Sequence, residues 1–193
     1  MSIIANMRMI IDALVKPEQY ISIEETPKGR VIDIGGGGEG INAQAGGSRI
    51  FAVDKFISEI LEAIDKASSS HWLVANAGKL PYSSASFANA TAFFSCMYMS
   101  EEMKKQVFRE THRALKPGGE FWIWDANIAP KQKAYGIRLH VAFPVQRSTK
   151  TMYGTRIKNQ SSAAICAQLQ EAGFETEVVS NQRHWFFIRA KIM

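Results

Sequence analysis

The chain has 193 residues, of which 46% are hydrophobic, and it carries a formal net charge of +5. This length and apolar content can bury one sizeable core but not two ordinary ones, so we expect a single domain spanning residues 1–193. No apolar run approaches the roughly 20 residues of a membrane-spanning helix, and the N-terminus lacks the pattern of a secretory signal. The two cysteines and four histidines are scattered, without the spacing of metal ligands. We therefore expect a cytoplasmic protein with no membrane contact and no bound metal.

Positive charge is concentrated in the last third of the chain. Residues 128–193 hold 10 Lys and Arg against 3 Asp and Glu, and residues 128–160 hold seven cations and no acidic residue. Two explanations stand: a solvated basic surface, or an attraction for an acidic substrate. We treat 128–160 as a basic insertion that forms the substrate region.

The first two thirds of the chain alternate strand and helix patterns. Residues 3–15 place apolar side chains at helical spacing, which predicts an amphipathic capping helix that ends before Pro17, with a linker up to residue 28. The elements expected next, in chain order, are strand 31–34, strand 49–53, helix 57–64, strand 71–75, strand 91–96, helix 101–115 and strand 120–125. Such alternation indicates a mostly parallel sheet with helices on both faces.

The C-terminal third is less regular at first. Alternating pieces at 137–145 and 151–157 are expected to pair as a β-hairpin across residues 146–150. Ser161 can cap a helix that runs through Leu169 and ends at Gly173. Two more strands are expected at the end of the chain, at 175–179 and 185–190. Their short connection makes the last strand antiparallel, so we predict a Rossmann-like α/β fold with a seven-stranded, mostly parallel sheet.

A glycine-rich turn follows the first strand directly. The segment 35–40 contains five glycines, so its backbone can turn tightly and approach a ligand without an intervening Cβ. Ligands of open α/β sheets bind at the carboxyl ends of the strands, where this turn lies. The spacing of Gly35, Gly37 and Gly40 fits G-x-G-x-x-G, which is equally typical of a dinucleotide site.

Two carboxylates beside the turn bear on the choice of ligand. Asp54 ends the next strand and is suited to bind ribose hydroxyls, as nicotinamide and S-adenosylmethionine proteins both require. Asp33 would repel a pyrophosphate but attract the ammonium of a methionine moiety, which favours S-adenosylmethionine. Structural alternatives are a strand-end residue that accepts local backbone bonds for Asp33 and a helix N-cap for Asp54.

With these residues in view, the chain resembles the class I S-adenosylmethionine-dependent methyltransferases, in particular the methyltransferase type 11-like small domain with a Leu-Pro-Phe/Tyr motif. The resemblance covers about residues 29–125. The segments that carry it, in the family's order, are 31–40, 51–55, 76–82 with Ser86-Phe87, and 108–119 with Lys116-Pro117-Gly118-Gly119.

The resemblance implies a role for each matching position. The methionine part of the cofactor would be held by Asp33 and the glycine turn, the ribose by Asp54, and the adenine edge by Asn76 and Ala77, while Ser95 would lie beside the methyl group. The full set of expected cofactor residues is Asp33, Gly35, Gly36, Gly37, Asp54, Lys55, Asn76, Ala77 and Ser95.

Two positions depart from the family pattern. Asn76 stands where the family commonly has Asp, and because an amide oxygen can still accept a hydrogen bond, weaker binding is expected and not its loss. Glu39 occupies the place of the third glycine of D-x-G-x-G-x-G. The turn is therefore expected to differ locally.

The expected reaction needs little covalent help from the protein. Methyl transfer from a sulfonium depends on in-line positioning, so a dedicated base can be absent and no catalytic residue is assigned. If the acceptor must lose a proton, the candidates are Tyr98, His140 and Tyr153. The structural alternatives, which we favour, are a pocket wall for Tyr98 and a partly exposed strand residue for His140.

The predicted function is therefore methyl transfer from S-adenosylmethionine to a small molecule of anionic character. Three alternatives remain: a non-catalytic S-adenosylmethionine-binding protein, an RNA methyltransferase whose basic stretch contacts phosphates, and an NAD-dependent oxidoreductase. The sequence predicts no oligomeric state.

Overall fold

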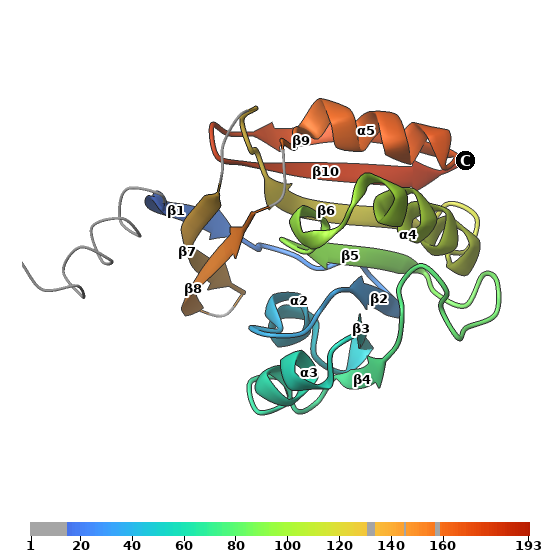
Figure 1. Ribbon diagram of the computed structural model, residues 1–193. Coiled ribbons are helices and arrows are strands. Elements are labelled where there is room, and N and C mark those ends of the chain that lie inside the picture. The colour runs from blue at the N-terminus through green and yellow to red at the C-terminus, as the bar shows by residue number, and fades with distance from the viewer. Residues whose placement is uncertain (1–14, 131–133, 145, 157–158) are drawn as a thin grey trace, which may run out of the picture.

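The larger of two β-sheets forms the centre of the fold (Figure 1). The computed structural model describes residues 15–130, 134–144, 146–156 and 159–193. In the order β4-β3-β2-β5-β6-β10-β9, the strands are β4 (His71–Val74), β3 (Ile50–Asp54), β2 (Val31–Ile34), β5 (Asn89–Phe93), β6 (Glu120–Ala126), β10 (Trp185–Ile192) and β9 (Phe174–Asn181). All pairs from β4 to β6 are parallel, and β10 is antiparallel to both its neighbours. The predicted fold class is confirmed.

One face of this sheet is covered by two helices, α4 (Glu101–Ala114) and α5 (Ser162–Glu171). Each helix begins at a serine N-cap, because the Ser100 hydroxyl accepts from the Met103 N–H and the Ser161 hydroxyl from the Ala164 N–H. Their apolar faces pack against alternate residues of the buried strands in one continuous core. The predicted serine cap of the second helix is confirmed.

The opposite face of the sheet is covered by two helices and by a second, smaller sheet. α2 (Ile41–Gly46) packs near the ends of β2 and β3, close to α3 (Ile57–Ile64). Beside them lies a three-stranded sheet made of β1 (Val15–Ser22), β7 (Tyr135–Phe143) and β8 (Arg147–Thr155), with β7 in the middle. Alternate residues of β7 are buried against aromatic side chains of β6 and β10. Among the residues that the structure describes, no helix combines the length and apolarity needed to cross a membrane.

Several boundaries differ from the sequence prediction, and three of these differences change an element or a loop. Residues 15–22, expected as a helix end and linker, form strand β1, while residues 3–14 of the helix predicted over 3–15 lie outside the described residues. The hairpin forms, but Phe143 pairs with Arg147, so residues 147–150 belong to β8 and not to the loop. β5 ends at Phe93, because Phe94 adopts a left-handed φ of 49° and turns the chain into the short helix η2 (Cys96–Tyr98).

Candidate cofactor and active site

The glycine turn is folded tightly over the end of β3. Gly35 and Gly36 both donate backbone N–H groups to the Val53 carbonyl, at 2.8 and 3.3 Å. A Cβ on Gly36 would lie 2.4 Å from Asp33 Oδ2, and one on Gly37 would lie 2.5 Å from Glu59 Cβ. The turn therefore needs glycine because the protein's own side chains approach its backbone, and both predicted carboxylates border it.

This packing gives a first testable prediction. We expect Gly36→Ala to lower the free energy of unfolding by about 1–3 kcal/mol, the usual cost of overpacking, as measured by urea denaturation. Gly118→Ala is the matched control, since a Cβ there meets nothing within 4 Å and only the positive φ of 75° is unfavourable. A smaller loss at Gly36 than at Gly118 would contradict the close approach.

Asp33 lies under the turn and is 1% exposed. Its Oδ1 accepts hydrogen bonds from Asn42 Nδ2 at 2.7 Å and from Thr91 Oγ1 at 2.8 Å. Burial raises the pKa of this carboxyl to about 6, so the ionised form is held at a cost that a nearby cation would offset. Its hydrogen bonds come from side chains, which differs from the alternative of a strand-end residue that accepts local backbone bonds. The environment suits an ammonium and disfavours a pyrophosphate.

Asp54 stands at the end of β3, beside the turn. Its Oδ2 accepts from the Gly37 N–H at 3.3 Å, and its Oδ1 accepts from the Phe56 N–H at 3.0 Å. The N-cap position of α3 falls on Phe56, so Asp54 is not the cap residue of that helix. Each carboxylate oxygen keeps a further lone pair for a ribose hydroxyl. The ammonium of Lys55 lies 4.6 Å from the centre of the Phe56 ring.

Asn76 and Ala77 follow β4 at the same edge. The Ala75 N–H donates to the Asp54 carbonyl at 2.9 Å, which extends the ladder and brings this segment beside Asp54. Asn76 is exposed, and its Oδ1 accepts from the Gly78 N–H at 2.9 Å. The second lone pair of that oxygen is left for an exocyclic amine, as the sequence prediction requires.

Ser95 brings the end of β5 against the turn. Its Oγ donates to the Ile34 carbonyl at 2.8 Å, and its Cβ lies 2.6 Å from the position that a Cβ on Gly35 would take. The predicted cofactor residues therefore come from the carboxyl ends of four neighbouring strands, β4, β3, β2 and β5.

Sequence reasoning missed the polar residues that support this edge. Thr91 pairs in register with Asp33 across β5 and β2, and Asn42 lies in α2, where its Nδ2 reaches Asp33. Glu39 joins the turn to its surroundings, because its carboxylate pairs with Lys66 at 3.1 Å and accepts from Thr149 Oγ1 of β8 at 3.1 Å.

A second buried carboxyl was also missed. Asp125 of β6 is fully buried and accepts from the Cys96 N–H at 2.8 Å and from Gln160 Nε2 at 2.7 Å. Burial raises the pKa of the Asp125 carboxyl to about 6. This contact fixes the backbone immediately after Ser95.

Comparison with known proteins agrees with this geometry. A family model described as a methyltransferase domain matches residues 32–123. Similar solved structures include the PH0226 protein from Pyrococcus horikoshii OT3 (TM-score 0.64, 16% identity, covering 86% of this chain and 84% of that one). Another is a SAM-dependent methyltransferase from Aquifex aeolicus (TM-score 0.62, 18% identity, covering 85% and 82%).

The predicted resemblance to the class I S-adenosylmethionine-dependent methyltransferases is confirmed over residues 32–123, the part of the chain that holds all the predicted cofactor residues. The predicted cofactor, S-adenosylmethionine, is confirmed at the level of the family. The [4+2]-cyclase SpnF has a similar fold (TM-score 0.62, 17% identity, covering 84% of this chain and 74% of that one). No curated protein matches the sequence.

Two of the three base candidates lie together in this methyltransferase domain. The Tyr153 ring stacks on Phe94 with centroids 5.2 Å apart, and the Tyr98 hydroxyl oxygen accepts from the Gly154 N–H at 3.2 Å. Burial raises the pKa of both phenols, so each is neutral at neutral pH and suited to donate a hydrogen bond. Neither has the electrostatics of an efficient base.

The third candidate, His140, lies elsewhere. It pairs with Lys150 across β7 and β8, whereas Tyr153 pairs with Ile137, and these positions alternate to opposite faces of the small sheet. The His140 ring instead packs 5.2 Å from that of Tyr20, whose side chain is exposed. The structure does not bring His140 to the candidate site.

Proposed function

We propose that this chain transfers the methyl group of S-adenosylmethionine to an anionic small molecule. The buried Asp33 carboxyl under the glycine turn is the observation that supports the cofactor most directly, because a cationic ligand group at that position would stabilise its desolvated negative charge. When bound, S-adenosylmethionine supplies an electrophilic methyl group.

The residues of this chain would act by positioning. Asp33 would hold the ammonium, Asp54 the ribose and Asn76 the adenine, while the stacked rings of Phe94 and Tyr153 would exclude water near Ser95. Placement of a nucleophile in line with the methyl group can supply most of the rate acceleration. No residue is assigned as a base.

Support for an anionic acceptor does not come from the hairpin cations Arg147 and Lys150. Two of the seven cations of residues 128–160 have partners within the chain: Arg147 donates to the Gln44 carbonyl at 3.0 Å, and Lys150 pairs with Glu18 at 3.1 Å. Lys131, Lys133 and Lys158 lie outside the described residues. Support for an acidic substrate therefore comes from other cations, Lys16 and Arg183, near the carboxyl end of β6.

A second candidate is a protein that binds S-adenosylmethionine without transferring its methyl group. The similarity to a [4+2]-cyclase favours keeping it, because the same architecture serves a protein named for another reaction.

Calorimetry and a transfer assay test the proposal. We expect S-adenosylhomocysteine to bind with a micromolar or lower dissociation constant and NADH not to bind, since Asp33 would oppose a pyrophosphate. Incubation with methyl-tritiated S-adenosylmethionine should then label members of a panel of carboxylate- and phosphate-bearing small molecules, with total RNA as a separate arm. Binding of NADH alone would overturn the cofactor assignment. Cofactor binding without transfer in any arm would favour the second candidate, and labelling of RNA alone would make the chain an RNA methyltransferase.

A further inference from the structure

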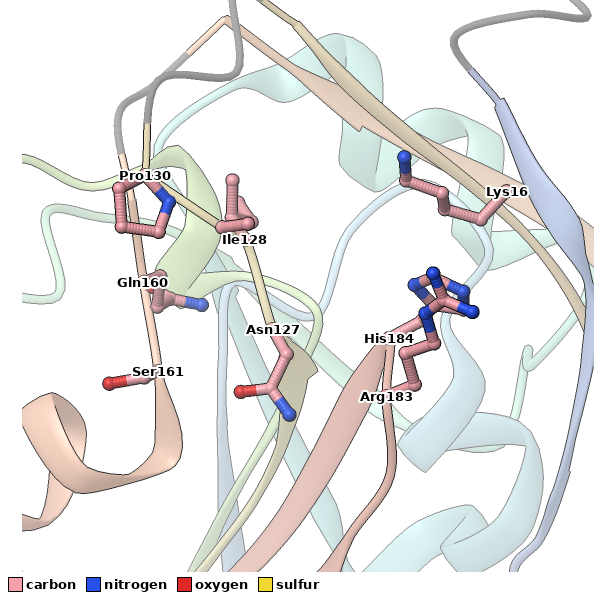
Figure 2. Close-up of a pocket in the computed structure, with 9 residues that line it drawn as sticks. Lys16, Asn127, Ile128, Pro130, Gln160, Ser161, Arg183 and His184 are labelled. Atoms are coloured by element: carbon pink, nitrogen blue, oxygen red, sulfur yellow. The ribbon is translucent and has the colours of Figure 1, made fainter.

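A cavity of about 360 Å³ lies near the carboxyl end of β6. Its walls come from four parts of the chain: the segment 127–130 after β6, Gln160 and Ser161 just before α5, Lys16 of β1, and Arg183 with His184 between β9 and β10. Figure 2 shows Lys16, Arg183 and His184 gathered on one side and Ile128, Pro130 and Gln160 on the other. Its volume falls within the range of small-molecule sites.

The charged residues lining this cavity are all cationic. Lys16 and Arg183 line it together with His184, and none of its lining residues is acidic. Among the described parts of the chain, none of these three side chains has an ion-pair partner. Burial lowers the pKa of the His184 imidazole, and the positive charges of Arg183 and Lys16 lower it further, so the groups are close enough to repel one another. An anion in the cavity would reverse this effect and favour the protonated imidazolium form of His184.

The opposite wall of the cavity contains Gln160, which is hydrogen-bonded to the end of β6. Gln160 is 4% exposed, and its Nε2 donates to Asp125 Oδ1 and to the Ala126 carbonyl. Its Oε1 is buried without a hydrogen-bond partner among the described residues, which is costly for a native amide. The Asp125 bond connects this wall to the Cys96 N–H, directly after Ser95.

The cavity lies at the same edge of the large sheet as the cofactor site. The strand order β2-β5-β6 puts the end of β6 two strands from the glycine turn, a separation of roughly 10 Å at ordinary strand spacing. This separation is comparable to the length of a small molecule.

We propose that this cavity binds the anionic group, a carboxylate or a phosphate, of the small molecule that accepts the methyl group, with Lys16, Arg183 and His184 as its cationic partners. The inference rests on the proposed function for the identity of the ligand as an acceptor. Binding of the anion itself does not depend on methyl transfer, so the two are tested separately.

Histidine NMR of the full chain provides the test, with benzoate and phenyl phosphate as probes. We expect one or both probes to shift the His184 imidazole signals and to raise the His184 pKa, while His71, His112 and His140 stay unchanged. Lys16→Gln and Arg183→Gln should each weaken probe binding by about tenfold, the loss typical of one charge-assisted hydrogen bond. Lys191→Gln, an exposed lysine of β10 that does not line the cavity, is the matched control and should bind as the wild type does.

The outcomes separate the two proposals. If neither probe shifts His184 beyond the other histidines, or if Lys16→Gln and Arg183→Gln bind like the control, the anion site is wrong even when S-adenosylhomocysteine binds. If the probes bind as expected but S-adenosylhomocysteine does not, the anion site stands and the proposed function fails. If a single-stranded RNA shifts His184 while both small anions do not, the site belongs to a nucleic acid and the small-molecule proposal is overturned.

Discussion

The variant Asp33→Asn is expected to lose cofactor binding and, at the same time, to gain stability. At neutral pH the wild-type carboxylate is ionised although it is 1% exposed and its pKa is raised to about 6. An Asn keeps an oxygen that can accept from Asn42 and Thr91, but it removes the buried charge. Because that charge would pair with the methionine ammonium, affinity for S-adenosylhomocysteine should fall by at least about 100-fold.

The stability gain has a defined pH window. A carboxyl whose pKa is raised on folding stabilises the folded state below its unfolded value, and this contribution is lost as the pH rises through the folded value. For Asp33 the two values are 3.8 and about 6, so the variant and the wild type should converge near pH 4. Above pH 6 the variant should be more stable by at most about 3 kcal/mol, from roughly 1.4 kcal/mol for each pKa unit.

Urea denaturation at pH 4 and pH 7.5, with calorimetry of S-adenosylhomocysteine binding, measures both effects. Asp65→Asn is the matched control, since Asp65 is an exposed carboxylate just after α3 and should change neither quantity. Retention of full affinity by Asp33→Asn would show that the ammonium is held elsewhere. A stability difference independent of pH would contradict the buried charge.

The sequence predicted those helices and strands whose residue pattern alone indicates their type and bounds. Strand β2 and helix α3 occur with the predicted bounds. A strand that is buried on both faces appears in the sequence as an apolar run, and an amphipathic helix appears as a 3.6-residue period. Strand β1 was missed because it depends on parallel pairing with β7, more than 100 residues away in sequence. The hairpin loop was misplaced because its left-handed residue is Gln146, which carries none of the usual Gly or Asn signal.

The residues of the candidate site also fall into two groups: those that the sequence predicts, and those whose positions depend on tertiary packing. Asp33 and Asp54 could be read from the sequence because they flank the glycine turn and end neighbouring strands. Their partners Asn42 and Thr91 depend on tertiary packing, which no spacing reveals. His140 was grouped with Tyr153 because the register of β7 and β8, which sends them to opposite faces, is not specified by either strand alone.

Asp54→Ala is expected to weaken S-adenosylhomocysteine binding by at least about 100-fold, since two ribose hydroxyls would lose a charged acceptor. The carboxylate also accepts from the Gly37 and Phe56 N–H groups, so the variant should lose about 1–2 kcal/mol of unfolding free energy as well. Calorimetry measures the first effect and urea denaturation the second.

Asp54→Asn separates the two roles of this residue. The amide keeps one acceptor oxygen for the turn and for one hydroxyl, so its affinity should fall between those of the wild type and Asp54→Ala. Glu59→Gln is the control, because Glu59 also borders Gly37 but is not an expected ligand. If Asp54→Ala loses stability and keeps its affinity, the carboxylate only shapes the turn and the ribose is bound elsewhere. If both variants lose affinity while Glu59→Gln does not, Asp54 acts on the cofactor itself.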